Sequence, residues 1–178
     1  MIMNTEVLLR NLRCIPDWPI PGVNFRDVTT LFKNPESLKE LSDGLYEMYK
    51  DKGITKIVGI ESRGFIMGAI LAERLGAGFV LCRKPGKLPG KILRESYQKE
   101  YGTDQIEIHE GSIEPDDVVL IHDDILATGG TIDAAIRLVR KFKPQNVMVN
   151  VIIELVNEGF EGRDVFPKDV EVSSLLKL

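Results

Sequence analysis

One stretch of sequence decides the fold: Val118-Val119-Leu120-Ile121-His122-Asp123-Asp124-Ile125-Leu126-Ala127-Thr128-Gly129-Gly130-Thr131. It begins with β-favouring apolar residues, which predict a buried strand, and it continues through two carboxylates into a turn rich in Thr and Gly. Residues 132–139 then follow a helical pattern. A strand, a Gly/Thr turn and a helix form an anion site, because unpaired amides at the start of the helix face the turn.

The same stretch predicts the kind of anion. The glycines of residues 128–131 let the backbone approach a ligand closely, and the threonines add hydroxyl donors. Asp123 and Asp124 are poor phosphate ligands but good acceptors for a vicinal diol. A phosphate site beside a diol site describes a ribose 5-phosphate. The alternative is an ordinary loop with a threonine helix cap; neither a Walker A loop nor a G-x-G-x-x-G fingerprint occurs.

Length and composition indicate one globular protein. A chain of 178 residues fits one domain, and its net charge of −4 argues against a general nucleic-acid binder. No apolar run reaches membrane-spanning length, and the first residues lack a signal-peptide pattern. Two cysteines, Cys14 and Cys82, are too few for a disulfide framework. We therefore expect a cytoplasmic protein that uses neither membrane nor nucleic acid.

The remaining segments predict an α/β fold. Asn34 is expected to cap a helix that Gly53 ends, and a stiff extended segment is expected at residues 16–21. Strands alternating with helices predict a mainly parallel twisted sheet flanked by helices on both faces. We expect helices at residues 5–15, 35–52 and 64–75, strands at 56–60, 78–82, 147–155 and 172–176, and an exposed hairpin at 93–109.

Two further turns carry positive charge. Arg63 follows the strand of residues 56–60, and its planar guanidinium suits phosphate. Arg83, Lys84 and Lys87 follow the next strand. Such charges are often only solvated surface. At neighbouring strand ends beside a ribose phosphate site, they instead predict a diphosphate site, because a departing diphosphate needs positive charge.

These motifs together resemble a known family. Residues 118–131 resemble the phosphoribosyl diphosphate (PRPP) motif of type I phosphoribosyltransferases. Pro16-Asp17-Trp18-Pro19-Ile20-Pro21-Gly22-Val23-Asn24-Phe25-Arg26-Asp27 is similar to the N-terminal hood of the adenine phosphoribosyltransferase family, and Glu95-Ser96-Tyr97-Gln98-Lys99-Glu100-Tyr101-Gly102 to its mobile catalytic loop. The resemblance implies one domain of residues 1–178, with a hood at 1–33, an α/β core at 34–178 and a flexible β-hairpin loop at about 88–109.

The resemblance also implies a reaction and its residues. Adenine and PRPP would give AMP and pyrophosphate, with Glu100 as the catalytic residue that handles the purine proton. Glu95, on the same segment, is expected to tolerate substitution by Gln. The implied substrate-binding residues are Asn24, Phe25 and Arg26 for the base, Asp123 and Asp124 for the ribose hydroxyls, Ala127, Thr128, Gly129, Gly130 and Thr131 for the 5′-phosphate, Arg63, Arg83, Lys84 and Lys87 for the diphosphate, and Tyr101 for loop closure.

Further features follow from the resemblance. Mg²⁺ would be held mainly by PRPP and water, with no protein metal site. The protein would be a homodimer, with Arg83 reaching across the interface, and the Glu61–Ser62 peptide would be cis. Asn24 stands where an apolar residue is expected, and His122 interrupts the usual apolar run before the acids. The alternatives are a phosphoribosyltransferase for 6-oxopurines or xanthine, and a PRPP-sensing regulatory protein on the same fold.

Overall fold

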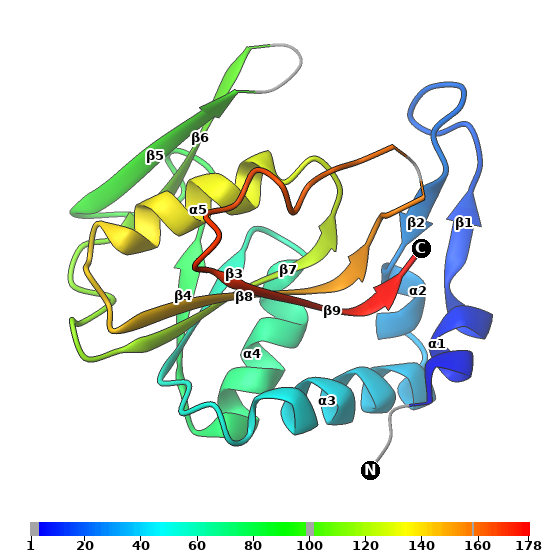
Figure 1. Cartoon of the computed structure of the whole chain (residues 1–178), viewed down its shortest axis with the longest axis horizontal. Helices are drawn as coiled ribbons and strands as arrows, with labels where there is room; N and C mark the ends of the chain where they lie inside the picture. The colour runs from blue at the N-terminus through cyan, green and yellow to red at the C-terminus, as the bar shows by residue number, and fades with distance from the viewer. Residues whose placement is uncertain (1–3, 99–101, 158) are drawn as a thin grey trace. The chain divides into compact units, whose positions relative to one another are not determined.

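The computed structural model describes residues 4–98, 102–157 and 159–178 (Figure 1). These residues form two compact units, Met1–Met48 and Tyr49–Leu178. None of the helices in the described ranges is long and apolar enough to cross a membrane. The first unit contains α1 (Thr5–Asn11), β1 (Arg13–Ile15), β2 (Phe25–Asp27), α2 (Thr29–Phe32) and most of α3 (Pro35–Tyr49). The second contains β3 (Lys56–Ile60), α4 (Gly64–Leu75), β4 (Gly78–Cys82), β5 (Ile92–Gln98), β6 (Thr103–His109), β7 (Val118–Leu126), α5 (Gly130–Arg140), β8 (Asn146–Glu154) and β9 (Glu171–Lys177).

The second unit is built on a five-stranded sheet in the order β4-β3-β7-β8-β9. Every neighbouring pair is parallel, so the predicted mainly parallel α/β sheet is confirmed. Figure 1 shows α4 on one face of this sheet and α5 on the other. The chain leaves β3 toward β4 on one side and leaves β7 toward β8 on the other. The strand order therefore reverses between β3 and β7, and ligands of such sheets bind outside the carboxyl ends of the strands at this point.

The core of this unit packs between the sheet and α5. Continuous apolar runs in β7 and β8 bury both faces of these strands, as central parallel strands require. The hairpin of β5 and β6 also contributes: Tyr97, Ile106 and Ile108 are buried in the same cluster. The predicted hairpin is thus confirmed, but the expectation that it is exposed is wrong for one of its faces.

The first unit corrects two predictions. The helix expected at residues 5–15 ends at Asn11, and Arg13–Ile15 instead pair antiparallel with Phe25–Asp27. A strand partner ten residues downstream overrides the local helical pattern. The segment of residues 16–21 is a compact turn, because the Asp17 carboxylate accepts a hydrogen bond from the Gly22 amide at 2.8 Å. The Asn34 cap is confirmed by a 2.9 Å bond from the Ser37 amide, although α3 ends at Tyr49.

Candidate active site at the carboxyl ends of the parallel strands

The turn between β7 and α5 has the geometry of an anion cradle. Gly129 occupies the cap position of α5 with φ of 81°, and no side chain among the described residues caps the helix start. The first amides of α5 are therefore left for solvent or a ligand. A side chain at Gly129 would overlap the carbonyl oxygen of Gly162, so only glycine fits both the backbone angle and the space.

Gly162 is a residue that the sequence analysis missed. A Cβ on Gly162 would in turn overlap the carbonyl oxygen of Ala127, so the loop before β9 lies directly against the cradle. The contact with Gly162 holds the turn in place, although Gly162 lies more than 30 positions after the turn in sequence. The local sequence around Gly162 gives no signal for this role.

The two adjacent acids lie near the end of β7, between the cradle and the turn that follows β3. The Asp124 carboxylate forms an ion pair with Arg63 Nε and is nearly buried. Asp123 Oδ1 accepts the Asp124 amide at 2.9 Å and would lie 3.2 Å from a Cβ on Gly64, at the start of α4. Burial of its carboxyl, reinforced by the neighbouring charge of Asp124, raises the pKa of Asp123 well above the ordinary aspartate value.

The turn after β3 joins the turn after β4. The Glu61–Ser62 peptide is cis, as expected. Glu61 accepts hydrogen bonds from Arg83 Nε and Nη2 at 3.2 and 3.1 Å and from the Lys84 amide at 2.8 Å. The hydrogen bond from Arg83 is the main reason that the pKa of Glu61 is lowered. The Arg83 guanidinium also donates to the Lys87 carbonyl at 3.3 Å, so it is engaged inside its own chain.

Lys84 reaches the hairpin. Its Nζ lies 2.5 Å from Asp104 Oδ2 and 2.9 Å from the Tyr97 hydroxyl, and it stands 5.5 Å from the centre of the Tyr97 ring. Partial burial acts to lower the pKa of Lys84, but the bonds to Asp104 and Tyr97 outweigh it and raise the pKa. Lys87 is exposed.

The structure therefore brings together several of the site residues that the sequence predicts. Arg63 of one turn touches Asp124 of β7, and the Gly/Thr turn follows two residues after this acid-bearing strand. Glu100, which the sequence predicts as the catalytic residue, and its neighbour Tyr101 lie outside the described residues. His122 is fully buried, and its Nδ1 donates a hydrogen bond to Asn150 Oδ1 at 3.0 Å. Burial lowers the pKa of His122 to about 4, so the imidazole is neutral at physiological pH.

The predicted base-binding residues lie in the first unit. Asn24 is exposed, and Phe25 and Arg26 begin β2, paired with β1. The ring of Trp18 packs at 66° to the Phe25 ring with centroids 4.5 Å apart. The sequence indicates only a stiff segment around Trp18 and gives no sign of this aromatic contact.

Comparisons with known proteins agree with this site. The model of the phosphoribosyl transferase domain matches residues 27–171. An adenine phosphoribosyltransferase of Bacteroides thetaiotaomicron is 62% identical over the whole of both chains. The crystal structure of the enzyme from Rhodothermus marinus is 50% identical and matches with a TM-score of 0.89 over 97% of each chain. The Giardia lamblia enzyme complexed with 9-deazaadenine is 40% identical, with a TM-score of 0.91 over 99% of each chain.

Proposed function

This chain belongs to the adenine phosphoribosyltransferases, and we propose that the residues at the carboxyl ends of β3, β4 and β7 carry out its reaction. The reaction is a purine salvage step, in which the 5-phosphoribosyl group of PRPP is transferred to adenine, giving AMP and pyrophosphate. The observation that carries the assignment of residues is the glycine-specific cradle that follows Asp123 and Asp124 at the point where the strand order reverses.

The ribose 5-phosphate end of PRPP is assigned to β7 and α5. The amides at the start of α5 and the hydroxyls of Thr128 and Thr131 donate to the 5′-phosphate, whose charge is favourable at a helix N-terminus. Asp123 and Asp124 accept the ribose hydroxyls. Because Arg63 holds Asp124, this acceptor is oriented before the substrate arrives.

The diphosphate end is assigned to the two cationic turns. A guanidinium has five N–H donors, so Arg63 can bind phosphate oxygens while it contacts Asp124. Arg83, Lys84 and Lys87 add positive charge from the turn after β4, which Glu61 ties to the turn after β3. These cations stabilise the charge that develops on pyrophosphate as its bond to the anomeric carbon breaks.

Mg²⁺ is the cofactor that this substrate implies. As a hard cation it takes oxygen ligands, and the diphosphate of PRPP offers them together with water. No cluster of three or more His, Cys, Asp or Glu side chains that could hold a metal occurs among the described residues. From the chemistry of the substrate we assign the ion mainly to PRPP and water, where it would supply neutralising charge for the diphosphate.

The base is assigned to the hood and the catalytic loop. Phe25 would stack on the purine, the backbone of Asn24 and Arg26 would bond its edge, Glu100 would accept or hold its proton, and Tyr101 would help the loop close and exclude water. The family resemblance supports these roles, and so does the Giardia lamblia relative, which was solved with 9-deazaadenine.

Two properties of the whole protein complete the proposal. We expect a homodimer, and the large apolar side chains of Ile66 and Leu81, 40% and 38% exposed, are candidates for its interface. Cys14 and Cys82 are both free thiols, which suits a reducing cytoplasm. Light scattering of the purified protein measures the first of these properties.

A purine panel tests the function. Purified protein with Mg²⁺ and PRPP is expected to form AMP and pyrophosphate from adenine and to use hypoxanthine, guanine and xanthine far more slowly. Equal turnover of hypoxanthine would contradict the adenine assignment and leave the reaction class intact. Tight PRPP binding without turnover of any purine would instead favour a PRPP-sensing regulator.

A further inference from the structure

The strand that precedes the proposed catalytic loop, β5, has one paired edge and one outer edge. Within the part of the chain that the structure describes, β5 pairs with β6 and with no other strand. On the far side of β6, the backbone of Glu107 exchanges two hydrogen bonds with Arg83, at 2.9 and 2.8 Å. The outward carbonyls of β5 need other partners, because an open strand edge leaves backbone groups unpaired.

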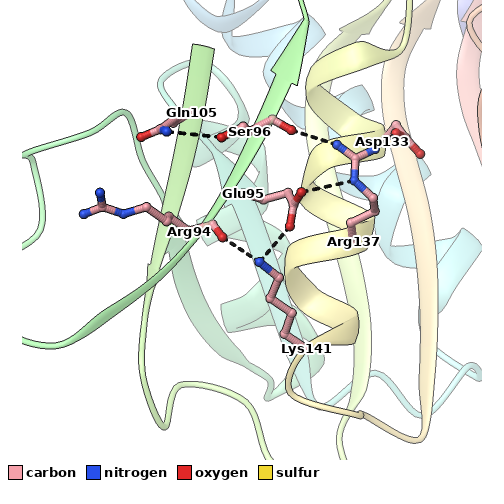
Figure 2. A network of polar contacts seen from close by, with 7 residues as sticks. All are labelled: Arg94, Glu95, Ser96, Gln105, Asp133, Arg137 and Lys141. Carbon is pink, nitrogen blue, oxygen red and sulfur yellow. Dashed lines mark hydrogen bonds and ion pairs between the residues drawn. The ribbon is translucent and has the colours of Figure 1, made fainter. Parts of the chain in front are cut away.

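Two cations supply those partners, Arg137 of α5 and the C-cap residue of that helix, Lys141, as Figure 2 shows. Arg137 Nη2 donates to the Ser96 carbonyl at 2.9 Å, and Lys141 Nζ donates to the Arg94 carbonyl at 2.7 Å. The spacing explains the match. Four residues rise about 6 Å along a helix, and two residues extend about 6.8 Å along a strand, so an i, i+4 pair of cations meets alternate carbonyls.

Glu95 lies between these two carbonyls and binds both cations. Its Oε1 accepts a hydrogen bond from Arg137 Nε at 3.3 Å, and its Oε2 lies 2.7 Å from Lys141 Nζ (Figure 2). The hydrogen bond from Lys141 is the main cause of a lowered pKa for Glu95. The side chain of Glu95 is only 20% exposed. Each ion pair is half open to solvent and so contributes little stability alone, but the set of contacts fixes one register between strand and helix.

Arg137 also reaches the end of α5 that forms the phosphate cradle. It pairs with Asp133, one turn earlier and in the first turn of the helix (Figure 2). A cavity of about 340 Å³ opens here, lined by Gly130 and Asp133 on the helix, by residues 96–98 of the hairpin and by Arg137 itself. The same guanidinium therefore contacts both elements that border this space.

We propose that Arg137 is a positioning residue for phosphoribosyl transfer: with Glu95 and Lys141 it fixes β5 against the helix whose first turn cradles the phosphate. The inference rests on the proposed function, since β5 leads directly to the segment that carries Glu100. This contact then sets the position of β5, the strand that precedes that segment, relative to the phosphate cradle. We therefore choose another control for Glu100, although the sequence leads to the expectation that Glu95 tolerates Gln.

Kinetics of two matched variants test the proposal. Arg137→Met removes the guanidinium and keeps the apolar stem, and it is expected to lower kcat about tenfold to a hundredfold, since a misplacement of about 1 Å has that effect. The KM for PRPP should change less than threefold, because backbone amides form most of the phosphate cradle. Arg140→Met is the control: Arg140 lies on the same helix and pairs with the exposed Asp169. It should leave kcat and KM unchanged.

Hydrogen exchange tests the anchoring without any substrate. Amides of residues 92–98 should exchange at least several-fold faster in Arg137→Met than in the native protein or in Arg140→Met, with α5 unchanged. Unchanged exchange in the hairpin, or an unchanged kcat in an active enzyme, would overturn the proposal. Failure of the native protein to form AMP would contradict the proposed function, and the exchange experiment would still decide whether Arg137 anchors β5.

Discussion

The two proposed anion sites bind negative charge by opposite means. The turn of residues 127–131 offers backbone amides and hydroxyls, contains no charged side chain, and is fixed by packing against Gly162. The turns after β3 and β4 offer cations, and three of these already pair with carboxylates of the same chain. The pairs are Arg63 with Asp124, Arg83 with Glu61, and Lys84 with Asp104.

This difference follows from what each site does with its anion. The 5′-phosphate enters as substrate and leaves as product on the same ribose, so a rigid cradle serves it throughout. The diphosphate changes from part of a substrate into a separate product. Because these cations pair with carboxylates of the same chain, their charge need not remain uncompensated after pyrophosphate leaves. The first site should therefore be sensitive to added bulk, and the second to changes of charge.

The largest effect is expected at Gly129. Gly129→Ala places a Cβ on a residue with φ of 81° and pushes it into the carbonyl of Gly162, so the cradle must deform. We expect kcat/KM for PRPP to fall about a hundredfold or more, as misplaced binding groups do. Gly111→Ala is the control, because Gly111 has φ of 72° with open space around it. Equal losses in both variants would mean that backbone angle alone, and not the packing of the cradle, matters.

The next effect separates proton handling from both anion sites. Glu100→Gln should lower kcat well over tenfold, within the usual contribution of acid–base help, and leave the KM for PRPP little changed. Glu110→Gln, an exposed carboxylate just after β6, is the control and should behave as the native enzyme does. An unchanged kcat in Glu100→Gln would remove Glu100 from the mechanism.

A smaller effect on ligand affinity is expected when Arg63 is replaced by a lysine, which has the same charge. Arg63→Lys retains a positive charge but loses the planar fork that contacts Asp124. The affinity for pyrophosphate should fall about tenfold, the value of one hydrogen bond to a charged group. Binding of ribose 5-phosphate should change less than threefold, because the cradle binds it. Calorimetric titration measures the affinity of the variant for pyrophosphate and for ribose 5-phosphate. Equal loss of affinity for the two ligands would contradict the distinction between the sites.

Much of this fold could be predicted from local sequence. The bounds of β3, α4 and β4 agree with the expectation, because continuous apolar runs are bordered by glycines such as Gly64 and Gly76. The helix expected at residues 5–15 ends at Asn11 instead, because the next residues form a strand in which Arg13 pairs with Asp27, a non-local partner. Local sequence patterns indicate whether a segment prefers helix or strand. They do not show which distant segment pairs with it.

In the candidate active site, too, local chemistry is visible in the sequence and long-range contacts are not. The Gly/Thr turn, the paired acids and the cationic turns are visible in sequence because their chemistry is local. The partners of these residues are not. That Gly162 packs behind the cradle, that Asp104 holds Lys84, and that Arg137 holds β5 depend on contacts between segments 20 to 41 residues apart. One sequence read alone contains no measure of such proximity.

The smallest expected effects are changes of stability with pH, and they have opposite signs in the two sites. The pKa of Glu61 is lowered by Arg83, so its stabilising contribution is present above the ordinary value of 4.5 and is lost as the pH falls through the folded-state pKa. The pKa of Asp123 is raised by burial, so the folded state loses stability as the pH rises above 3.8 toward the folded-state pKa. At pH 7 and without ligand, Glu61→Gln should therefore lower Tm by about 2–4 °C, the equivalent of about 1 kcal/mol in a chain of this size.

Asp123→Asn should raise Tm at pH 7, because the amide keeps an oxygen for the Asp124 backbone and carries no charge that burial penalises. The Asp123→Asn difference should shrink as the pH falls below 3.8, where this carboxyl is protonated in the unfolded chain as well. The Glu61→Gln difference should shrink as the pH falls below 4.5 and through the folded-state pKa of Glu61. Calorimetric scans of the native protein and both variants from pH 2 to pH 8 measure this. The same sign for both variants at pH 7 would show that Asp123 is stabilised as a carboxylate, as Glu61 is, and the acid that faces the ribose would then be held by charge in the way that the diphosphate turns are.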